Sequence, residues 1–398
     1  MNIRKIVIIL SLILGMGYAY ADDELTVRDV TVARNGKAIL AIETAFESDV
    51  FFGYQLEVVL PKGLTITLNS DGKPTAESYT ALDIVGSVLS KTSEYTTYQF
   101  VATKMGNPRI PAGNYVLLSM PIESDGTLEV GTVLECSVTN ILFSDGTQTG
   151  KTMSNRAFTV TITDKMVLDE NSPVVPMATD GVVDLLVKRT IKGGEWSTIC
   201  LPLDMTEDDL YDAFGNDVQL AEFDTYEVND DGGIEVNFYE TDMSKGLYAN
   251  WPYLIMTSAD VTSFEVTAEV KPHEDEAIAE YETGKGKNKR TVGTFTGTLH
   301  AGTVIPADNL FLNGNNFHYS VGKTRCKAFR AYFWFEDVLS DVENASSRIS
   351  FFVEHDMTGI SKIQHVNETN NVFDLQGRHV VKPAKGIYVK DGKKVIIK

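Results

Sequence analysis

The sequence predicts a mainly β protein with a two-sheet sandwich, a second β-rich domain that contains one short helix, and a small C-terminal β module. Hydrophobic and polar side chains alternate with a period of two along segments such as 54–60 and 158–163, which is typical of half-buried strands. Dipeptides that favour tight hairpin turns separate several strand segments, namely Asn35-Gly36, Asp71-Gly72, Asp125-Gly126 and Asp145-Gly146. Many short strands with repeated turns favour two packed sheets.

Length and charge limit the classes of protein to consider. The chain has 398 residues, enough for two or three domains at about 150 residues each. Hydrophobic residues make up 43% and charged residues 23%, as in soluble globular proteins, which excludes low-complexity and multi-span membrane proteins. Fifty-five acidic and 35 basic residues give a net charge of −20, which repels phosphate backbones. We therefore expect no nucleic-acid partner.

Residues 1–21 have the pattern of a secretory signal peptide. Arg4 and Lys5 give a positively charged start, and 6–16 form an apolar run that is too short to span a bilayer. A small-x-small cleavage site follows this run, and its residues are Ala19, Ala21 and Asp22. We expect the mature chain to begin at Asp22, to be exported, and to have no transmembrane span.

The first domain is expected over 22–164. The residues at 25–32, 51–64 and 158–162 resemble a cohesin-type jelly-roll domain, from a superfamily that also contains carbohydrate-binding modules. The resemblance implies a sandwich that binds a protein partner such as a dockerin, or a glycan, and it implies no catalysis. It carries over no individual binding residue.

A linker is expected over 165–183, because Pro173, Pro176 and the turn dipeptide Asp180-Gly181 lie in a polar stretch. The second β-rich domain then covers 184–356. Its one helix begins after Thr206, which can cap it together with an acid three residues later, and ends at Gly215. Three segments of this domain resemble β domains that recur in large surface proteins of anaerobic Gram-negative bacteria: 196–203, 249–255 and 327–333.

After a short linker over 357–371, residues 372–398 predict three short strands, the last two joined by the turn Asp391-Gly392. This segment resembles the C-terminal sorting domain recognised by type IX secretion, which implies the secretion machinery as a partner. The residues that carry the resemblance are Gly377, Gly386, Tyr388, Lys393, Lys394 and Lys398. The alternative is that the segment forms the last hairpin of the preceding domain.

Three cysteines cannot all pair within one chain. Cys136 alternates with apolar neighbours, so we expect its thiol to face the core as a small hydrophobe. Cys200 and Cys326 have two interpretations, a disulfide or two reduced buried thiols. The sequence contains no CxxC pair and no Cys/His cluster, so it does not indicate zinc.

No motif indicates catalysis. The six histidines are scattered, and neither HExxH nor Gly-x-Ser-x-Gly is present. The segment 229–232 is similar to a calcium loop but lacks the ligand spacing of an EF-hand, so a tight hairpin explains it better. We therefore expect no enzyme activity and no cofactor, with calcium elsewhere in the first domain as an open alternative.

The three tryptophans, Trp196, Trp251 and Trp334, have two interpretations. They form a flat platform for sugar rings, or they are buried aromatic anchors, which the apolar residues around each one favour. The combined expectation is a non-catalytic adhesion protein, secreted or on the outer surface of a Gram-negative bacterium, that recognises a glycan or a surface protein. The alternatives are a structural subunit of a surface layer or fimbria, and a polysaccharide-degrading hydrolase or an accessory to one.

Overall fold

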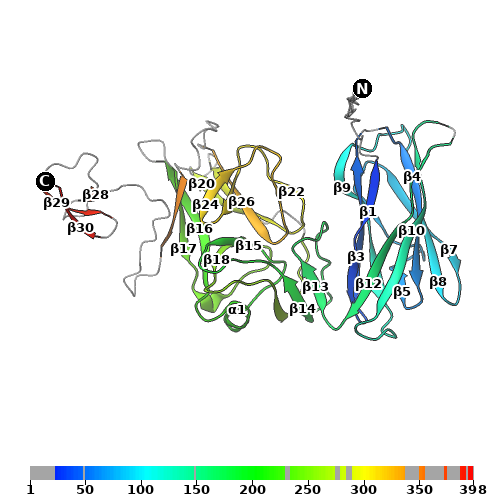
Figure 1. Ribbon diagram of the computed structural model, residues 1–398, viewed down its shortest axis with the longest axis horizontal. Coiled ribbons are helices and arrows are strands. Elements are labelled where there is room, and N and C mark those ends of the chain that lie inside the picture. The colour runs from blue at the N-terminus through cyan, green and yellow to red at the C-terminus, as the bar shows by residue number, and fades with distance from the viewer. Residues whose placement is uncertain are drawn as a thin grey trace, which may run out of the picture.

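The structure is a computed structural model. It describes residues 23–47, 50–147, 149–228, 234–273, 278–283, 289–336 and 349–354. It also describes the backbone of three C-terminal strands, β28 (Val372–Phe373), β29 (Gly386–Lys390) and β30 (Lys393–Ile397). These residues form a mainly β protein with two large β units, as the sequence predicted (Figure 1).

The first unit contains strands β1 to β12 in two sheets. The strands of one sheet are β1 (Glu24–Val27), β3 (Lys37–Phe46), β5 (Leu64–Ile66), β6 (Glu77–Ser78) and β9 (Gly113–Ser124). The strands of the other are β2 (Val30–Ala33), β4 (Gly53–Pro61), β7 (Asp83–Lys91), β8 (Tyr95–Thr103), β10 (Val133–Ser144), β11 (Lys151–Thr152) and β12 (Arg156–Thr163). The first sheet has the order β1-β3-β9-β5, with β6 on β9, and the second has the order β2-β12-β10-β4-β8-β7, with β11 on β10.

Both sheets of the first unit contribute to one hydrophobic core, which makes the unit a sandwich. Leu40 and Ile122 come from the first sheet, and Leu56 and Val160 come from the second. The period-two pattern at 54–60 and 158–163 is confirmed as β4 and β12, with every second side chain buried. At one end, the rings of Phe46, Phe51 and Phe143 pack within 5.2 Å of one another.

Two of the four predicted hairpin turns do not form hairpins. Asn35-Gly36 joins β2 to β3, and Asp125-Gly126 joins β9 to β10, so each turn carries the chain from one sheet to the other. They also pack together, because a Cβ on Gly126, at φ +76°, would lie 1.9 Å from Oδ1 of Asn35. Such dipeptides specify a tight turn, and the pairing of the next strand depends on contacts distant in sequence.

The second unit contains three main sheets. The first consists of β13 (Met166–Asp169), β14 (Val183–Lys188) and β19 (Phe264–Ala268). The second has the order β15 (Ser197–Ile199), β18 (Tyr253–Met256), β16 (Gln219–Val228), β17 (Ile234–Glu240) and β27 (Ile349–Glu354). The third has the order β20 (Ile278–Thr283), β21 (Arg290–Thr298), β26 (Arg330–Phe335), β23 (Leu310–Asn313) and β24 (Asn316–Tyr319). The short strands β22 (Thr303–Val304) and β25 (Arg325–Cys326) pair separately.

The predicted helix is confirmed as α1 (Glu207–Phe214). Thr206 forms a capping box, because its hydroxyl accepts the backbone N–H of Asp209, whose carboxylate accepts the backbone N–H of Thr206 at 2.8 Å. Leu210 and Phe214 are buried on one face, and the helix ends at Gly215. A short 3-10 helix, η1 (Met243–Lys245), is the other helical turn among the described residues.

The segment 165–183 was predicted to be a linker, and this prediction is wrong for its first part. Residues 166–169 form β13, which pairs in parallel with β14 and buries Leu168 in the core of the second unit. The second unit therefore begins at β13 and not at residue 184. The prolines that suggested a linker begin only at Pro173, after β13 has ended. Each residue of β13 pairs with a residue 19 positions later, so the local sequence pattern did not indicate this strand.

The C-terminal strands β28, β29 and β30 form one antiparallel sheet. Its strand content matches the three short strands predicted over 372–398. The signal-peptide residues 1–21, with Ala19 and Ala21, the cleavage-site residue Asp22, and the linker over 357–371 lie outside the described residues.

Candidate functional site

One face of the first unit is turned away from the core. It is formed by the outward side chains of β10, β4, β8 and β7, and we call it the flat face. Short side chains dominate it: Ser137 and Thr139 on β10, Gln55, Glu57 and Val59 on β4, Thr97, Gln99 and Val101 on β8, and Val85 and Ser87 on β7. Alternation explains this for β4 and β8, because the intervening residues of these two strands are buried in the core.

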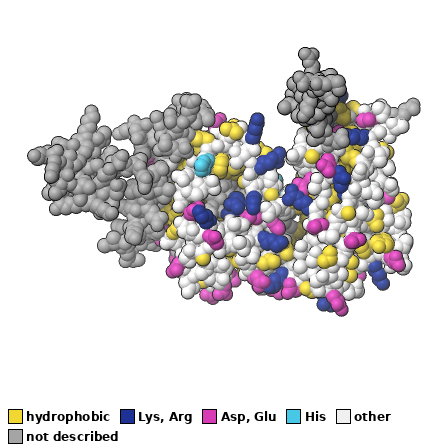
Figure 2. Space-filling model, in the orientation of Figure 1, with side chains coloured by type: hydrophobic (Ala, Val, Ile, Leu, Met, Phe, Trp, Pro, Cys, Tyr) yellow, Lys and Arg dark blue, Asp and Glu magenta, His cyan; other side chains and the backbone are white. Residues whose placement is uncertain are grey.

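Exposed hydrophobic side chains gather at the β7–β8 end of the flat face. Val85 and Val101 are directly opposite each other in register and are 59% and 38% exposed. Leu89, at the bulge of β7, and Tyr95, at the start of β8, are about half exposed as well. Figure 2 shows hydrophobic side chains at this edge of the molecule, where Figure 1 draws β7 and β8. Clusters of this kind on a soluble protein mark interaction sites.

Charge is sparse on the flat face. The carboxylate of Glu57 accepts a hydrogen bond of 2.7 Å from the side-chain amide of Asn140. At the rim, Lys104 pairs with Asp83 at 3.2 Å, and both side chains are exposed. The centre of the face is therefore uncharged apart from Glu57 and presents hydroxyl, amide and methyl groups. A protein surface of similar polarity can cover a face of this composition.

Sequence reasoning missed this face. Residues 83–91 and 95–103 alternate in the manner of a strand pair, which was the available signal. The pattern does not show whether Val85 and Val101 are exposed or covered by another layer, because that depends on the packing of the whole sandwich.

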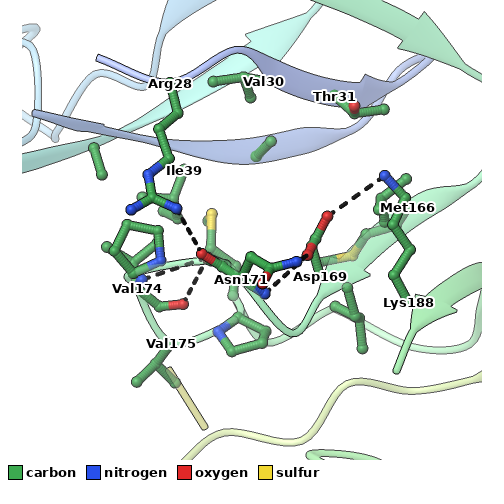
Figure 3. A pocket seen from close by; sticks show the side chains of 18 of the residues that line it. Arg28, Val30, Thr31, Ile39, Met166, Asp169, Asn171, Val174, Val175 and Lys188 are labelled. Atoms are coloured by element: carbon green, nitrogen blue, oxygen red, sulfur yellow. Dashed lines mark hydrogen bonds and ion pairs between the residues drawn. The ribbon is translucent and has the colours of Figure 1, made fainter. Parts of the chain in front are cut away.

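A cavity of about 200 Å³ lies between the two units (Figure 3). The first unit contributes residues of β2 and β3 and the connection before β2, and the second contributes β13 and the segment 171–177. Val174 is buried against Ala41 and Val116 on the outer side of the first sheet, and this contact closes one side of the cavity. The wall is mixed, with apolar side chains such as Val30 and Met166 beside charged ones.

The charged side chains of this cavity are already paired. Arg28 binds Glu43 through two nitrogens and donates a third hydrogen bond of 3.0 Å to the backbone carbonyl of Asn171. Lys188 lies 3.5 Å from Asp169, whose other oxygen accepts the backbone N–H of Asn171 at 2.8 Å (Figure 3). The bond from Arg28 to Asn171 joins the first unit to the segment after β13, and the bonds of Asp169 fix that segment within the second unit, so the cavity is part of an inter-unit contact.

Glu170 is a buried anion at the start of that segment. It is 3% exposed and accepts hydrogen bonds from Lys327 at 2.7 Å, Arg330 at 3.0 Å and the Thr190 hydroxyl at 2.9 Å. Arg189, with no exposed surface, lies 3.7 Å from the same carboxylate. One carboxylate therefore faces three cations from two distant parts of the chain.

The pKa of Glu170 reports this environment. Burial alone would raise it, but the hydrogen bond from Lys327, the charge of Arg330, the hydrogen bond from Thr190 and the charge of Arg189 together lower it below its ordinary value. Burial lowers the pKa of Arg189 to about 9, which still leaves its guanidinium charged at neutral pH. Arg189 also donates to the backbone carbonyls of Phe329 at 3.1 Å and Thr198 at 2.6 Å. The cluster is a structural core element.

The three predicted platform tryptophans do not form one surface. Trp196 is 5% exposed and belongs to a core cluster of the second unit. Trp251 is partly buried and packs against both core clusters of that unit. Trp334 lies on β26 between Phe333 and Phe335, which are buried, so its half-buried ring points to the opposite side of the sheet. Only Trp334 is placed where a sheet-face ligand could stack on it.

The cysteines are free thiols in the structure. Cys136 and Cys200 are buried, Cys136 on the inner side of β10 as expected, and Cys326 is partly buried on β25. Burial raises the pKa of the Cys136 and Cys200 thiols to about 12. The disulfide between Cys200 and Cys326 is therefore absent from this structure.

The described residues have neither the ligand cluster of a metal site nor a helix that could cross a membrane. Within the described ranges, no three His, Cys, Asp or Glu side chains converge as a metal site would require. The segment 229–232, similar to a calcium loop, lies outside the described residues. The part of the chain that the structure describes has no helix with the length and apolar character needed to cross a bilayer.

Of the predicted sorting residues, Gly386 and Tyr388 lie on β29 and Lys393 and Lys394 lie on β30. Gly377 and Lys398 lie outside the described residues. Four of the six residues therefore lie on strands of the C-terminal sheet, and recognition by a secretion system stays a prediction.

Fold and surfaces together define the class: a mainly β protein whose first unit is a two-sheet sandwich with one open face. No protein-family profile matches the chain, and no curated protein matches it. Solved structures with similarity include cohesins. The sixth cohesin of scaffoldin B from Acetivibrio cellulolyticus, solved with a dockerin, is 11% identical, with a TM-score of 0.28, and the match covers 35% of this chain and 99% of that one.

Two further cohesins show the same kind of similarity. A type III cohesin module from a cell-surface anchoring scaffoldin of Ruminococcus flavefaciens is 12% identical, with a TM-score of 0.27, over 35% of this chain and 88% of that one. A non-cellulosomal cohesin from Archaeoglobus fulgidus is 10% identical, with a TM-score of 0.26, over 35% of this chain and 91% of that one.

Proposed function

We propose that this chain is an exported, non-catalytic binding protein of the cell surface, and that its first unit holds a protein partner on the flat face. The observation that carries the proposal is the exposed pair Val85 and Val101, in register on a sheet surface whose other side chains are mostly uncharged. Removing such apolar area from water contributes about 25 cal/mol per Å², and the surrounding hydroxyl and amide groups supply hydrogen bonds at the rim.

Export and surface display are part of the proposal. They are supported by the signal-peptide pattern of residues 1–21 and by the resemblance of 372–398 to a sorting module. The acidic charge of the whole chain also suits a protein that remains soluble outside the cell.

The test is a pull-down with the full mature chain from the envelope proteins of the cell that makes it. The perturbed chain carries Val85→Asp and Val101→Asp, which place two carboxylates in the centre of the apolar cluster. We expect a specific protein to bind the wild-type chain and to be lost from the double variant. The matched control is Val321→Asp, which changes a valine that is 66% exposed in the second unit.

All three sites are exposed, so each substitution should change the free energy of unfolding by about 0.5 kcal/mol. The double variant should lose up to about 1 kcal/mol more, because its two carboxylates lie directly opposite each other and repel. Circular dichroism melts confirm that the variants are folded. The proposal is contradicted if the double variant retains the same protein. It is also contradicted if no chain, including the wild type, retains a specific protein.

A second candidate function is supported by the edge strand. Among the described residues β7 hydrogen bonds to β8 alone, so its other edge of nine residues is open to an added strand. A structural subunit of a surface layer or fimbria would use this edge. Static light scattering separates the two functions, because a binding protein stays monomeric whereas a subunit polymerises as its concentration rises.

A further inference from the structure

The third sheet of the second unit has a second aromatic surface besides its buried one. Phe333 and Phe335 of β26, Phe317 of β24 and Phe295 of β21 face the core. The alternate residues face the other way. They include Tyr332 and Trp334 on β26, Phe311 on β23 and His318 on β24, and all four are half-buried. We call these four side chains the aromatic face.

The strand register places three of these rings in one row. Leu310 of β23 pairs with Phe333 of β26, so the adjacent residues Phe311 and Tyr332 lie on the same side of the sheet next to this pair. Phe311 in turn pairs with His318, and their rings stack with centroids 5.4 Å apart and planes 24° from parallel. Because neighbouring strands are about 4.8 Å apart, the row extends roughly 10 Å across three strands, and Trp334 extends the surface two residues along β26.

Hydrogen-bonding groups without partners lie beside the rings. Glu280 on β20 pairs in register with Thr294, which pairs with Trp334, so these three residues share the same side of the sheet. Among the described residues, the carboxylate of Glu280, the indole N–H of Trp334 and the ring nitrogens of His318 have no hydrogen-bond partner.

The aromatic rings and the hydrogen-bonding groups beside them indicate which class of ligand fits this face. Flat rings offer a surface for stacking, and Ile278 is the aliphatic side chain beside them on this side of β20. Nucleic-acid bases also stack on aromatic rings, but they bring phosphates, which the free carboxylate of Glu280 and a net charge of −20 repel. A neutral sugar ring has one nonpolar C–H side that stacks on a ring plane and a rim of hydroxyl groups that bind a carboxylate and an indole N–H.

We propose that the aromatic face binds a neutral glycan chain by stacking sugar rings on Trp334, Tyr332 and Phe311, while Glu280 accepts hydrogen bonds from sugar hydroxyls. The site lies on the second unit and is independent of the flat face. Of the three tryptophans considered from the sequence, Trp334 alone belongs to it.

The experiment is affinity gel electrophoresis of the full mature chain in gels that contain one soluble neutral polysaccharide each: mixed-linkage β-glucan, xyloglucan, galactomannan, arabinoxylan or starch. We expect at least one polysaccharide to retard the wild-type chain. Trp334→Ala should then raise the dissociation constant at least tenfold, and Glu280→Gln should raise it severalfold. The matched control is Tyr239→Ala, which removes an exposed aromatic ring of β17 outside the aromatic face.

Two further measurements keep the result interpretable. Trp334→Phe keeps a ring plane without the N–H and should retain intermediate affinity, and saturating polysaccharide should change the tryptophan emission of the wild-type chain but not that of Trp334→Ala. The proposal is overturned if no polysaccharide retards the chain, if Trp334→Ala binds as the wild type does, if polygalacturonate or single-stranded DNA is the ligand that binds, or if Trp334→Ala abolishes a dimer seen by light scattering.

Discussion

Replacing Glu170 by Gln tests how much one buried anion stabilises the second unit. The substitution keeps the size of the side chain and removes its charge, so Arg189, fully buried at 3.7 Å, loses its counter-charge. Breaking a buried ion pair by removing one partner costs about 3–5 kcal/mol. We expect about 3 kcal/mol, the lower end of that range, because Arg189 keeps its hydrogen bonds to three backbone carbonyls.

Lys327 and Arg330 add little to this loss, because their side chains are 48% and 30% exposed and can turn to water. Urea unfolding followed by tryptophan fluorescence measures the effect in the right part of the chain, since Trp196, Trp251 and Trp334 are the only tryptophans and all lie in the second unit. With an m-value of about 2 kcal/mol/M, the midpoint should fall by roughly 1.5 M.

The matched control is Glu265→Gln, which breaks an exposed pair of 2.5 Å with Lys165. It should cost less than about 1 kcal/mol. If Glu170→Gln shifts the midpoint no further than this control, the carboxylate does not stabilise Arg189 and the reasoning is refuted.

The same variant has a predicted pH dependence. The folded pKa of Glu170 is lowered, so the unfolded chain takes up the proton first as the pH falls. The contribution of Glu170 is therefore complete above the unfolded pKa of about 4.3 and is lost as the pH falls through the lower folded value. The difference in midpoint between wild type and variant should shrink below about pH 4 and stay constant from pH 6 to 8.

Three further predictions concern local features. Thr206→Ala removes the cap of α1 and should cost about 1 kcal/mol in the same urea assay, whereas a value near zero would show that the capping box is not needed. Gly246→Ala should cost more than Gly302→Ala, although both have positive φ, because the added Cβ would lie 2.1 Å from a backbone oxygen in the first case and 3.7 Å from a flexible arginine in the second; equal losses would contradict this. Cys136 and Cys200 should react with a thiol reagent at pH 8 only after unfolding, and rapid labelling of the native chain would contradict their burial.

Local patterns predicted much of this fold. Alternation identified β4 and β12, and a capping residue with an acid three positions later identified α1. These signals are local, because a strand face and a helix cap are specified by residues within one element. Strand β13 was missed because its four residues are defined by a parallel partner beyond a proline-containing segment.

The candidate surfaces were harder to predict than the strands. Along β26 the sequence alternates between Phe333 and its neighbours Tyr332 and Trp334, and both sets are aromatic, so composition does not show which side is buried. The row that joins Tyr332 to Phe311 and His318 depends on the register of three strands. The same holds for Val85 and Val101, whose exposure depends on the absence of a covering layer among the described residues.

The pairing of β2 with β12 has a mechanical consequence. These strands lie near the start and the end of the first unit and run parallel, with Val30 beside Val160 and Ala33 beside Thr163. A pull between the two ends of the unit is therefore directed along the strands and strains every hydrogen bond of this ladder at once, in shear, instead of opening them one at a time like a zipper. If the unit is anchored at one end and pulled at the other, the β2–β12 ladder should resist mechanical unfolding.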